Sequence, residues 1–169
     1  KLFLRPKILR MSITGKNIIG NDLSANGKSS FQAANPASSS LLPEIFYNAT
    51  SEEITTAAQK AAAAFTAYNK KSPIEKAAFL DAIADEIMAL GDDLLNRAMA
   101  ESGLPAARLT GERGRTTGQL KMFAQLLREG SWVSACIDTA IPDRQPLPKP
   151  DLRRMMDAVG PVVVFGASN

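Results

Sequence analysis

The feature that most constrains the fold is the stretch from Val159 to Asn169, which has the sequence VGPVVVFGASN. Three consecutive valines and a phenylalanine lie between Gly160-Pro161 and Gly166. This pattern predicts a short strand that is buried on both faces, as in parallel sheets. In open α/β proteins, ligands bind beyond the carboxyl ends of such strands. We therefore predict an α/β fold with cofactor-binding and reactive groups at this end of the sequence.

The overall composition is that of a globular protein and excludes several classes of function. Hydrophobic residues make up 45% of the 169 residues, and no apolar run approaches the ~20 residues that cross a membrane. The net charge of +3 is small and dispersed, so neither a nucleic acid nor a membrane is expected as a partner. Histidine is absent, which excludes a histidine metal site and a Ser-His-Asp triad, and no metal is expected.

The single cysteine, Cys136, is expected to be a structural residue in a half-buried strand rather than a nucleophile. Its neighbours in the sequence include no basic residue of the kind that activates a thiol. It cannot form an internal disulfide, and such low cysteine use is typical of a reducing compartment. A cytoplasmic location is therefore expected.

Short β-type segments are expected before the helices. Residues 1–10 are basic and free of acidic residues, and they are expected to be a leader or an upstream remnant, because Met11 is the expected start of the protein. From Ile13 to Phe31, short apolar runs alternate with turn-forming clusters, which predicts a small edge hairpin. Leu41 to Tyr47 is expected to form a further strand that Pro43 keeps at an edge.

Three helices are expected in the middle of the chain. The first begins at Thr50 and the second at Ser72, and each of these residues is followed three positions later by a glutamate that completes a capping box. The second helix is expected to continue to Gly103, because glycine commonly ends helices. Pro105 is expected in the first turn of the third helix, which spans Ala106 to Glu129.

The third helix carries Gly111, Gly114 and Gly118 on one face. Each interior glycine costs about 1 kcal/mol relative to alanine, so this arrangement requires a reason. One explanation is that a neighbouring backbone approaches closely. The other is that this face lines a cleft in which Arg115 and Gln119 contact a substrate.

A long hairpin arm is expected after the helices. Residues Trp132 to Ile141 alternate between apolar and polar positions, which predicts a strand. Four prolines between Pro142 and Pro150 exclude regular structure there, and Asp151 to Val159 is expected to return antiparallel. Two strands alone are marginally stable in water, so the arm is expected to pack on a partner subunit or on another part of the protein.

Three motifs resemble the aldehyde dehydrogenase superfamily. They are Gly114 to Leu120 (GRTTGQL), Pro142 to Arg154 (PDRQPLPKPDLRR) and Gly160 to Asn169 (GPVVVFGASN). The order of edge strands, helices, proline-rich arm and buried strand agrees with this resemblance, which runs from about Ile13 to the last residue. Within the superfamily, the motifs are most similar to NADP-preferring 2-oxoglutarate semialdehyde (2,5-dioxovalerate) dehydrogenases and to fatty aldehyde dehydrogenases.

This resemblance implies an α/β fold that is the N-terminal portion of an aldehyde dehydrogenase. Its parts would be edge strands, three helices, an oligomerisation hairpin and the first part of a Rossmann-like parallel sheet. The fold would be truncated within that sheet. Residues 11–131 would form the N-terminal part of the cofactor-binding domain. Residues 132–158 would form the oligomerisation hairpin of a homo-oligomer. Residues 159–169 would start the cofactor sheet.

The resemblance also implies which residues function in the site. NADP or NAD would bind at Phe165, Gly166, Ala167 and Ser168. Asn169 would donate its side-chain amide to the oxyanion that forms when a thiolate attacks the aldehyde carbonyl. The nucleophilic cysteine and the general base would not lie in these residues, since the single cysteine does not match the catalytic one of the family. The 169-residue chain alone is therefore expected to be inactive.

The implied substrate is 2-oxoglutarate semialdehyde, with Arg115 as a partner for its carboxylate, and a long-chain fatty aldehyde is the alternative. A short-chain reductase would also place Gly-Ala-Ser after a strand. However, its fingerprint continues with glycine, where this chain has Asn169, and lies near the start of its fold. A non-enzymatic helical interaction module is the alternative from another class.

Overall fold

The computed structural model describes residues 13–166 and combines helices with short antiparallel strands. The helices are α1 (Ser51–Asn69), α2 (Pro73–Ala89), α3 (Gly91–Ser102) and α4 (Ala106–Glu129), followed by the 3-10 helix η1 (Ser131–Val133). The strands are β1 (Asn17–Ile19), β2 (Asp22–Ser24), β3 (Ser30–Asn35), β4 (Ser40–Tyr47), β5 (Cys136–Asp138) and β6 (Leu152–Arg154).

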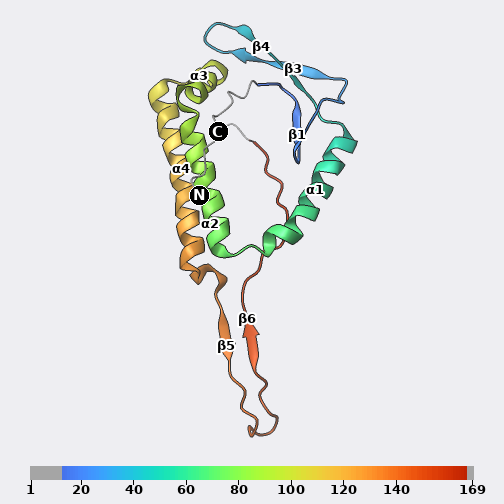
Figure 1. Ribbon diagram of the computed structural model, residues 1–169, viewed down its shortest axis with the longest axis vertical. Coiled ribbons are helices and arrows are strands. Elements are labelled where there is room, and N and C mark those ends of the chain that lie inside the picture. The colour runs from blue at the N-terminus through green and yellow to red at the C-terminus, as the bar shows by residue number, and fades with distance from the viewer. Residues whose placement is uncertain (1–12, 167–169) are drawn as a thin grey trace, which may run out of the picture.

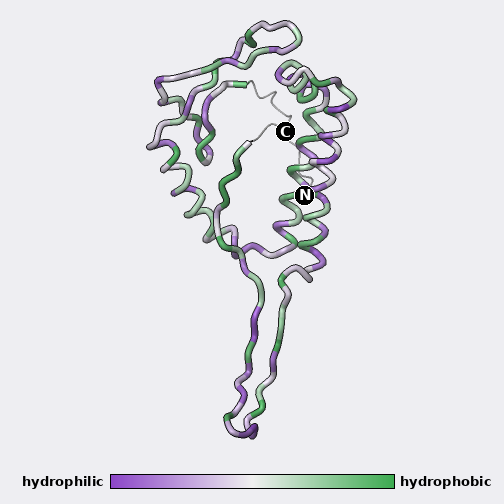
Figure 2. Tube along the Cα trace, turned by 180° about the vertical axis from the view of Figure 1, so that it is seen from behind, coloured by the Kyte–Doolittle hydropathy of each residue, from purple (hydrophilic) through white to green (hydrophobic). Residues whose placement is uncertain are grey.

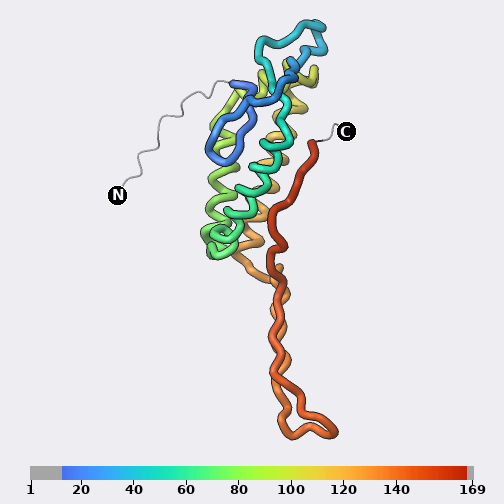
Figure 3. The backbone as a smooth tube through the Cα atoms, turned by 90° about the vertical axis from the view of Figure 1, so that its right-hand side faces the viewer, coloured from blue at the N-terminus to red at the C-terminus, as the bar shows by residue number. Residues whose placement is uncertain are grey.

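These elements form an open frame from which one long arm projects (Figure 1). Helices α2 and α4 pack together on one side of the frame, and α1 lies on the other. The hairpin of β3 and β4 lies across the top, and the hairpin of β1 and β2 lies below it beside α1 (Figure 1). The arm contains β5 and β6 and extends along the longest axis of the molecule (Figure 3). After the arm, the chain turns back towards the frame. Residues 155–166 project onto the opening of the frame in Figure 1, and the side view of Figure 3 shows them along one face of the helices.

The N-terminal strands form two separate hairpins. Strands β1 and β2 pair antiparallel around a turn in which Gly20 has a φ of +66°, which favours glycine, and this confirms the predicted edge hairpin. Phe31 was predicted within that hairpin but belongs to β3, which pairs with β4. The rings of Phe31 and Phe46 stack across the second hairpin with their centroids 5.5 Å apart. Pro43 is tolerated because, among residues 13–166, β4 pairs with β3 alone and has a free edge.

Glu53 joins the first hairpin to the start of α1. The predicted capping box is confirmed: Glu53 N–H donates to Thr50 Oγ1 at 3.1 Å, and Thr50 N–H donates to Glu53 Oε2 at 2.8 Å. The other carboxylate oxygen of Glu53 accepts from the Ser24 hydroxyl and, at 3.3 Å, from the Asn26 N–H. These donors hold the pKa of Glu53 below its usual value, with the Ser24 hydroxyl as the largest cause. One capping residue therefore also orients β2.

The second predicted helix is two helices in the structure. The capping box of Ser72 and Glu75 starts α2 as predicted, but α2 ends at Ala89 instead of continuing to Gly103. Gly91 adopts a φ of +56° at the junction, a left-handed conformation that breaks the helix, and α3 follows directly. Gly103, with a φ of 69°, ends α3 and confirms the predicted terminator.

Helix α4 has the predicted bounds and packs against α2. Pro105 is its N-cap rather than a residue of its first turn, which corrects its predicted position by one residue. Ala77 and Ala84 of α2 and Ala124 of α4 are 0% exposed, so small side chains let the two helices approach closely. Salt bridges link Asp81 to Arg128 and Asp85 to Lys121 across the pair, with N–O distances of 2.5 and 3.3 Å. None of the helices within residues 13–166 is long and apolar enough to span a bilayer.

The arm is antiparallel, as predicted, but its strands are shorter. Strand β5 pairs with β6, and an isolated bridge joins Ile141 to Lys149 nearer the tip. The strand predicted to start at Trp132 starts at Cys136, because η1 occupies residues 131–133 and Ser134 has a left-handed φ of 46°. The return strand, predicted over 151–159, is limited to Leu152–Arg154.

The predicted buried strand at residues 161–165 is exposed and unpaired in this structure. Residues 155–166 are in no strand of the described chain, and Val163 and Phe165 are 77% and 87% exposed. Figure 2 shows this segment as a hydrophobic stretch of the trace. The prediction of burial on both faces is therefore wrong for the chain as described. A parallel strand requires neighbouring strands on its edges, and residues 13–166 place none beside it.

Candidate functional site

The predicted substrate residues lie on the outer surface of α4. Arg115 has a 77% exposed side chain, and its Nη2 and Nε donate to Glu112 Oε2 at 2.6 and 3.0 Å. Arg108 Nη2 lies 3.0 Å from the other oxygen of Glu112. The hydrogen bond from Arg115 is the largest cause that lowers the pKa of Glu112. Gln119 is exposed one turn further along the helix.

The glycine face of α4 is open. No atom lies within 4 Å of the position that a Cβ would take at Gly111, Gly114 or Gly118, leaving aside the chain neighbours and the helix's own backbone. The explanation by close approach of a backbone is therefore wrong within the described residues. The explanation by a cleft beside Arg115 and Gln119 stays a prediction.

The predicted cofactor residues are described only in part. Phe165 and Gly166 lie at the end of the exposed segment, whereas Ala167, Ser168 and Asn169 lie outside the described residues. Within residues 13–166, no hydrogen bond or salt bridge joins α4 to residues 159–166. The structure thus does not bring the predicted substrate and cofactor residues into one site.

Cys136 has the structural position that the sequence predicts. It is a free, half-buried residue in β5, where it pairs with Arg154 of β6. The described residues contain no group of three or more histidine, cysteine, aspartate or glutamate side chains that could hold a metal ion. Within the part of the chain that the structure describes, Cys136 therefore belongs to no such cluster.

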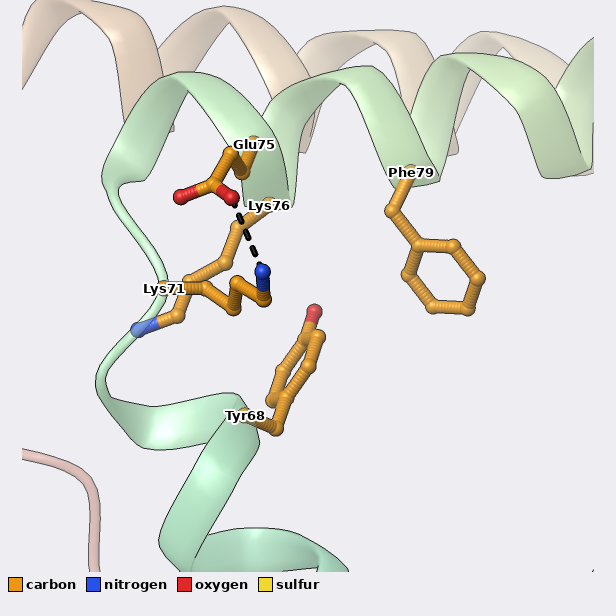
Figure 4. Close-up of a pocket in the computed structure, with 5 residues that line it drawn as sticks. All are labelled: Tyr68, Lys71, Glu75, Lys76 and Phe79. Carbon is orange, nitrogen blue, oxygen red and sulfur yellow. Dashed lines mark hydrogen bonds and ion pairs between the residues drawn. The ribbon is translucent and has the colours of Figure 1, made fainter.

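A pocket of about 380 Å³ lies at the turn between α1 and α2 (Figure 4). Tyr68 at the end of α1 and Phe79 in α2 supply its apolar lining, and their rings meet edge to face with centroids 6.1 Å apart. The remaining lining residues are Lys71, Glu75 and Lys76. Sequence analysis did not identify this pocket. Its lining residues come from the end of α1, from the turn and from α2, and only the fold of the turn brings them together.

The carboxylate in this pocket is held by its own helix start. Glu75 Oε2 accepts from Ser72 N–H at 2.8 Å and from Ser72 Oγ at 2.9 Å, and Oε1 accepts from Lys71 Nζ at 3.0 Å. Together these donors lower the pKa of Glu75 to about 2, with the backbone N–H of Ser72 as the largest cause. Glu75 is therefore a fixed anion at neutral pH.

Comparison with known sequences gives one family over most of the chain. The sequence model of the aldehyde dehydrogenase family matches residues 23–162. An Azospirillum brasilense protein, alpha-ketoglutaric semialdehyde dehydrogenase 2, is 48% identical over 160 residues, which are 94% of this chain and 30% of the relative. The alpha-ketoglutaric semialdehyde dehydrogenase of Acinetobacter baylyi is 45% identical over 155 residues, which are 92% of this chain and 30% of the relative. The chain thus spans less than a third of the length of these relatives.

Solved structures share the fold. An NAD-dependent benzaldehyde dehydrogenase from Corynebacterium glutamicum superposes with a TM-score of 0.69 at 18% identity, over 80% of this chain and 28% of the other. A succinate-semialdehyde dehydrogenase from Burkholderia pseudomallei gives a TM-score of 0.64 at 28% identity, over 74% of this chain and 25% of the other. Both matches support the predicted N-terminal portion of this α/β fold.

Proposed function

Because the chain belongs to the aldehyde dehydrogenase family, we propose that the whole protein oxidises an aldehyde to a carboxylate with a nicotinamide cofactor. The observation that carries this proposal is the family match, which begins in β2 and extends through the arm into the exposed valine segment. The alternative of a non-enzymatic helical module has no comparable support.

The proposed substrate is 2-oxoglutarate semialdehyde, which would be oxidised to 2-oxoglutarate. Both curated relatives described above act on this aldehyde according to their names, and they match nearly the whole chain. Arg115 is the proposed partner for the substrate carboxylate, with Gln119 beside it. Its exposed guanidinium shares Glu112 with Arg108, so a second carboxylate is able to bind its remaining donors.

The described end of the cofactor segment leaves room for a ligand. Phe165 is exposed, and no atom of residues 13–164 lies within 4 Å of a Cβ placed at Gly166. These residues fit the proposal that Phe165 to Ser168 hold NADP or NAD, which would accept a hydride when bound. The proposed role of the segment is to expose backbone groups to the cofactor at the end of an extended chain. Because Gly166 has no side chain, a dinucleotide can approach the backbone closely there.

Asn169 is the proposed oxyanion donor. When a thiolate attacks an aldehyde, the carbonyl oxygen gains negative charge, and an oriented amide N–H stabilises that charge without transferring a proton. The proposed nucleophile and general base belong to other parts of the protein, because Cys136 lies half-buried in the arm. We therefore propose that the 169-residue chain does not turn over by itself.

We propose the following organisation of the protein. Residues 11–131 contribute to the cofactor-binding domain, 132–158 form an oligomerisation arm, and 159–169 enter the cofactor sheet. The exposed apolar side chains of Ile137 and Leu152 on the arm support assembly of a homo-oligomer. The single free cysteine supports a reducing, cytoplasmic location.

Steady-state assays of the whole protein test the proposed substrate. We expect kcat/KM for 2-oxoglutarate semialdehyde to exceed that for a long-chain aliphatic aldehyde, with both measured by reduction of NADP and of NAD. Replacing Arg115 by glutamine is expected to raise KM for the semialdehyde and to leave KM for the aliphatic aldehyde unchanged. A preference for the aliphatic aldehyde would overturn the proposed substrate, and an absence of cofactor reduction with any aldehyde would overturn the proposed reaction.

A further inference from the structure

We propose that Glu112 of α4 is a positioning residue for the proposed aldehyde oxidation. It holds the guanidinium of Arg115 so that one edge of this group stays free for the carboxylate of the substrate. The inference rests on the proposed function, in which Arg115 binds that carboxylate. The geometry that carries it is the pattern of hydrogen bonds at the Arg115 nitrogens.

Glu112 binds one edge of the Arg115 guanidinium. Arg115 Nε and Nη2 both donate to Glu112 Oε2, at 3.0 and 2.6 Å. A guanidinium is a rigid planar fork, and a carboxylate binds it either at the edge of Nε and Nη2 or at the edge of Nη1 and Nη2. Within the described residues, Nη1 of Arg115 donates to no acceptor. The edge of Nη1 and Nη2 is therefore left for a second carboxylate, which can bind it through two parallel hydrogen bonds.

Arg108 offsets the negative charge of Glu112. Its Nη2 lies 3.0 Å from Glu112 Oε1, the oxygen that Arg115 does not use. Two cations therefore share one anion, and the three side chains together keep a net positive charge. Because the hydrogen bond from Arg115 lowers the pKa of Glu112 below its ordinary value, Glu112 is ionised at neutral pH and binds both arginines. A second carboxylate thus meets a positive group of side chains.

The surface around Arg115 is open. The Arg115 side chain is 77% exposed. Gly111 lies four residues before Arg115 and Gly118 three residues after it, so both are its neighbours on the surface of α4. Apart from the chain neighbours and the helix's own backbone, no described atom lies within 4 Å of a Cβ placed at either glycine. A ligand can therefore reach Arg115 across positions that carry no side chain.

A guanidinium that is already oriented loses less entropy when it binds a carboxylate. A free arginine side chain loses rotamer freedom when a ligand immobilises it, and the two hydrogen bonds to Glu112 restrict Arg115 beforehand. An exposed ion pair contributes little to stability, so orientation is the effect expected from Glu112. An aldehyde without a carboxylate makes no use of the free edge. Glu112 therefore favours the semialdehyde over an aliphatic aldehyde.

Steady-state kinetics of the whole protein test the role of Glu112. The quantity measured is the ratio of KM for 2-oxoglutarate semialdehyde to KM for a long-chain aliphatic aldehyde. Glu112→Ala is expected to raise this ratio about fivefold, which corresponds to ordering one long side chain on binding. Glu112→Gln keeps one acceptor oxygen and is expected to restore most of the loss. In the Arg115→Gln background, Glu112→Ala is expected to change the ratio by less than about twofold, because the guanidinium that it orients is absent.

Asp85→Ala is the matched control. It also removes one carboxylate that pairs with a cation of α4, Lys121, and it changes the net charge equally. It is expected to change the ratio by less than about twofold, as for a screened charge at a distance. An equal rise in Asp85→Ala and Glu112→Ala would mean a general effect of charge and would overturn the inference.

The other outcomes separate this inference from the proposed function. A lower ratio in Glu112→Ala would show that Glu112 competes with the substrate for Arg115, and it would overturn the positioning role. An unchanged ratio in Glu112→Ala, together with a raised ratio in Arg115→Gln, would also overturn that role but leave the proposed function intact. An unchanged ratio in Arg115→Gln would overturn the proposed substrate contact and the positioning role together. Circular dichroism of each variant checks that the fold is retained.

Discussion

Two regions of the molecule are rich in apolar and small residues but lie in opposite environments. One is the pair of helices α2 and α4, and the other is the segment of residues 159–166. Ala84 and Ala124 are completely buried where the two helices pack, whereas Val163 and Phe165 face solvent. Each helix satisfies its backbone hydrogen bonds internally and needs only a complementary face to pack on. A parallel strand needs neighbours for its backbone as well as for its side chains, and the described residues supply none.

The difference between the two regions explains why they respond differently to mutation. In the helical pair, the alanines at the contact between α2 and α4 are already buried within the described chain, so volume changes there are expected to act on its free energy of unfolding. In the valine segment, burial depends on strands that the described residues do not contain. The following predictions use the 169-residue chain to test this difference.

The largest effect is expected in the helical pair. Ala84→Leu adds volume at a position that is 0% exposed and should lower the free energy of unfolding by about 2 kcal/mol, because the helices cannot separate without losing contacts. Urea unfolding measures this change. The control is Ala62→Leu at an exposed position of α1, which should change stability by less than about 0.5 kcal/mol. Equal effects of the two substitutions would contradict the close packing of α2 and α4.

A smaller effect is expected at the start of α1. Thr50→Ala removes the hydroxyl that accepts from Glu53 N–H and should lower the free energy of unfolding by about 1 kcal/mol. The matched control is Thr56→Ala, because the hydroxyl of Thr56 bonds only to the carbonyl of Glu52 one turn earlier. Urea unfolding of both variants makes the comparison. A loss of stability in Thr56→Ala as large as that in Thr50→Ala would show that the cap is not the cause.

The free energy of unfolding is expected to depend on pH because of the glutamate that caps the start of α2. The pKa of Glu75 is about 2, below its ordinary value of 4.5, so the ionised form is favoured in the folded state. The resulting stability is present above pH 4.5 and is lost as the pH falls towards 2. Ser72→Ala removes a donor to Glu75 and should raise this pKa, as measured by NMR titration of the carboxyl carbon. The control Lys121→Gln, in α4, should leave it unchanged. A normal pKa of Glu75 in the unmodified chain would contradict this account of the cap.

The smallest effect is expected in the valine segment. Val163→Ser should change the unfolding free energy of the 169-residue chain by less than about 0.5 kcal/mol, because the side chain already contacts solvent. The same substitution in the whole protein should cost at least about 1.5 kcal/mol if the segment is a buried strand there. Thermal or urea unfolding of both forms gives the two values. A large loss in the 169-residue chain would contradict the exposure of this segment.

Local signals in the sequence were sufficient for the helices. The capping boxes at Thr50 and Ser72, the terminator Gly103 and the bounds of α4 were all predicted, because each depends on residues within one or two turns. The break at Gly91 was missed, since glycine inside a periodic apolar pattern is compatible with a continuous helix. It became visible only through the backbone angle and the hydrogen bond from Arg113 Nη1 to Gly91 O.

Non-local contacts account for the remaining differences. The length of the arm strands depends on Ser134, whose left-handed conformation could not be inferred from alternation of apolar residues. The pocket between α1 and α2 depends on the fold of a turn, which brings Tyr68 against Phe79. For the candidate aldehyde site, the sequence motifs were sufficient to identify the family. The position of Arg115 relative to Phe165 could not be predicted, because it depends on contacts between segments that are far apart in the sequence.

The most direct test of the proposed function is the effect of Asn169→Ala on kcat in the whole protein. The proposed oxyanion donor predicts a loss of about 100-fold or more in kcat for aldehyde oxidation, with little change in cofactor binding. Ser168→Ala is the neighbouring control and should affect cofactor binding more than kcat. An Asn169→Ala enzyme with unchanged kcat, under conditions where chemistry limits turnover, would contradict the role assigned to this residue.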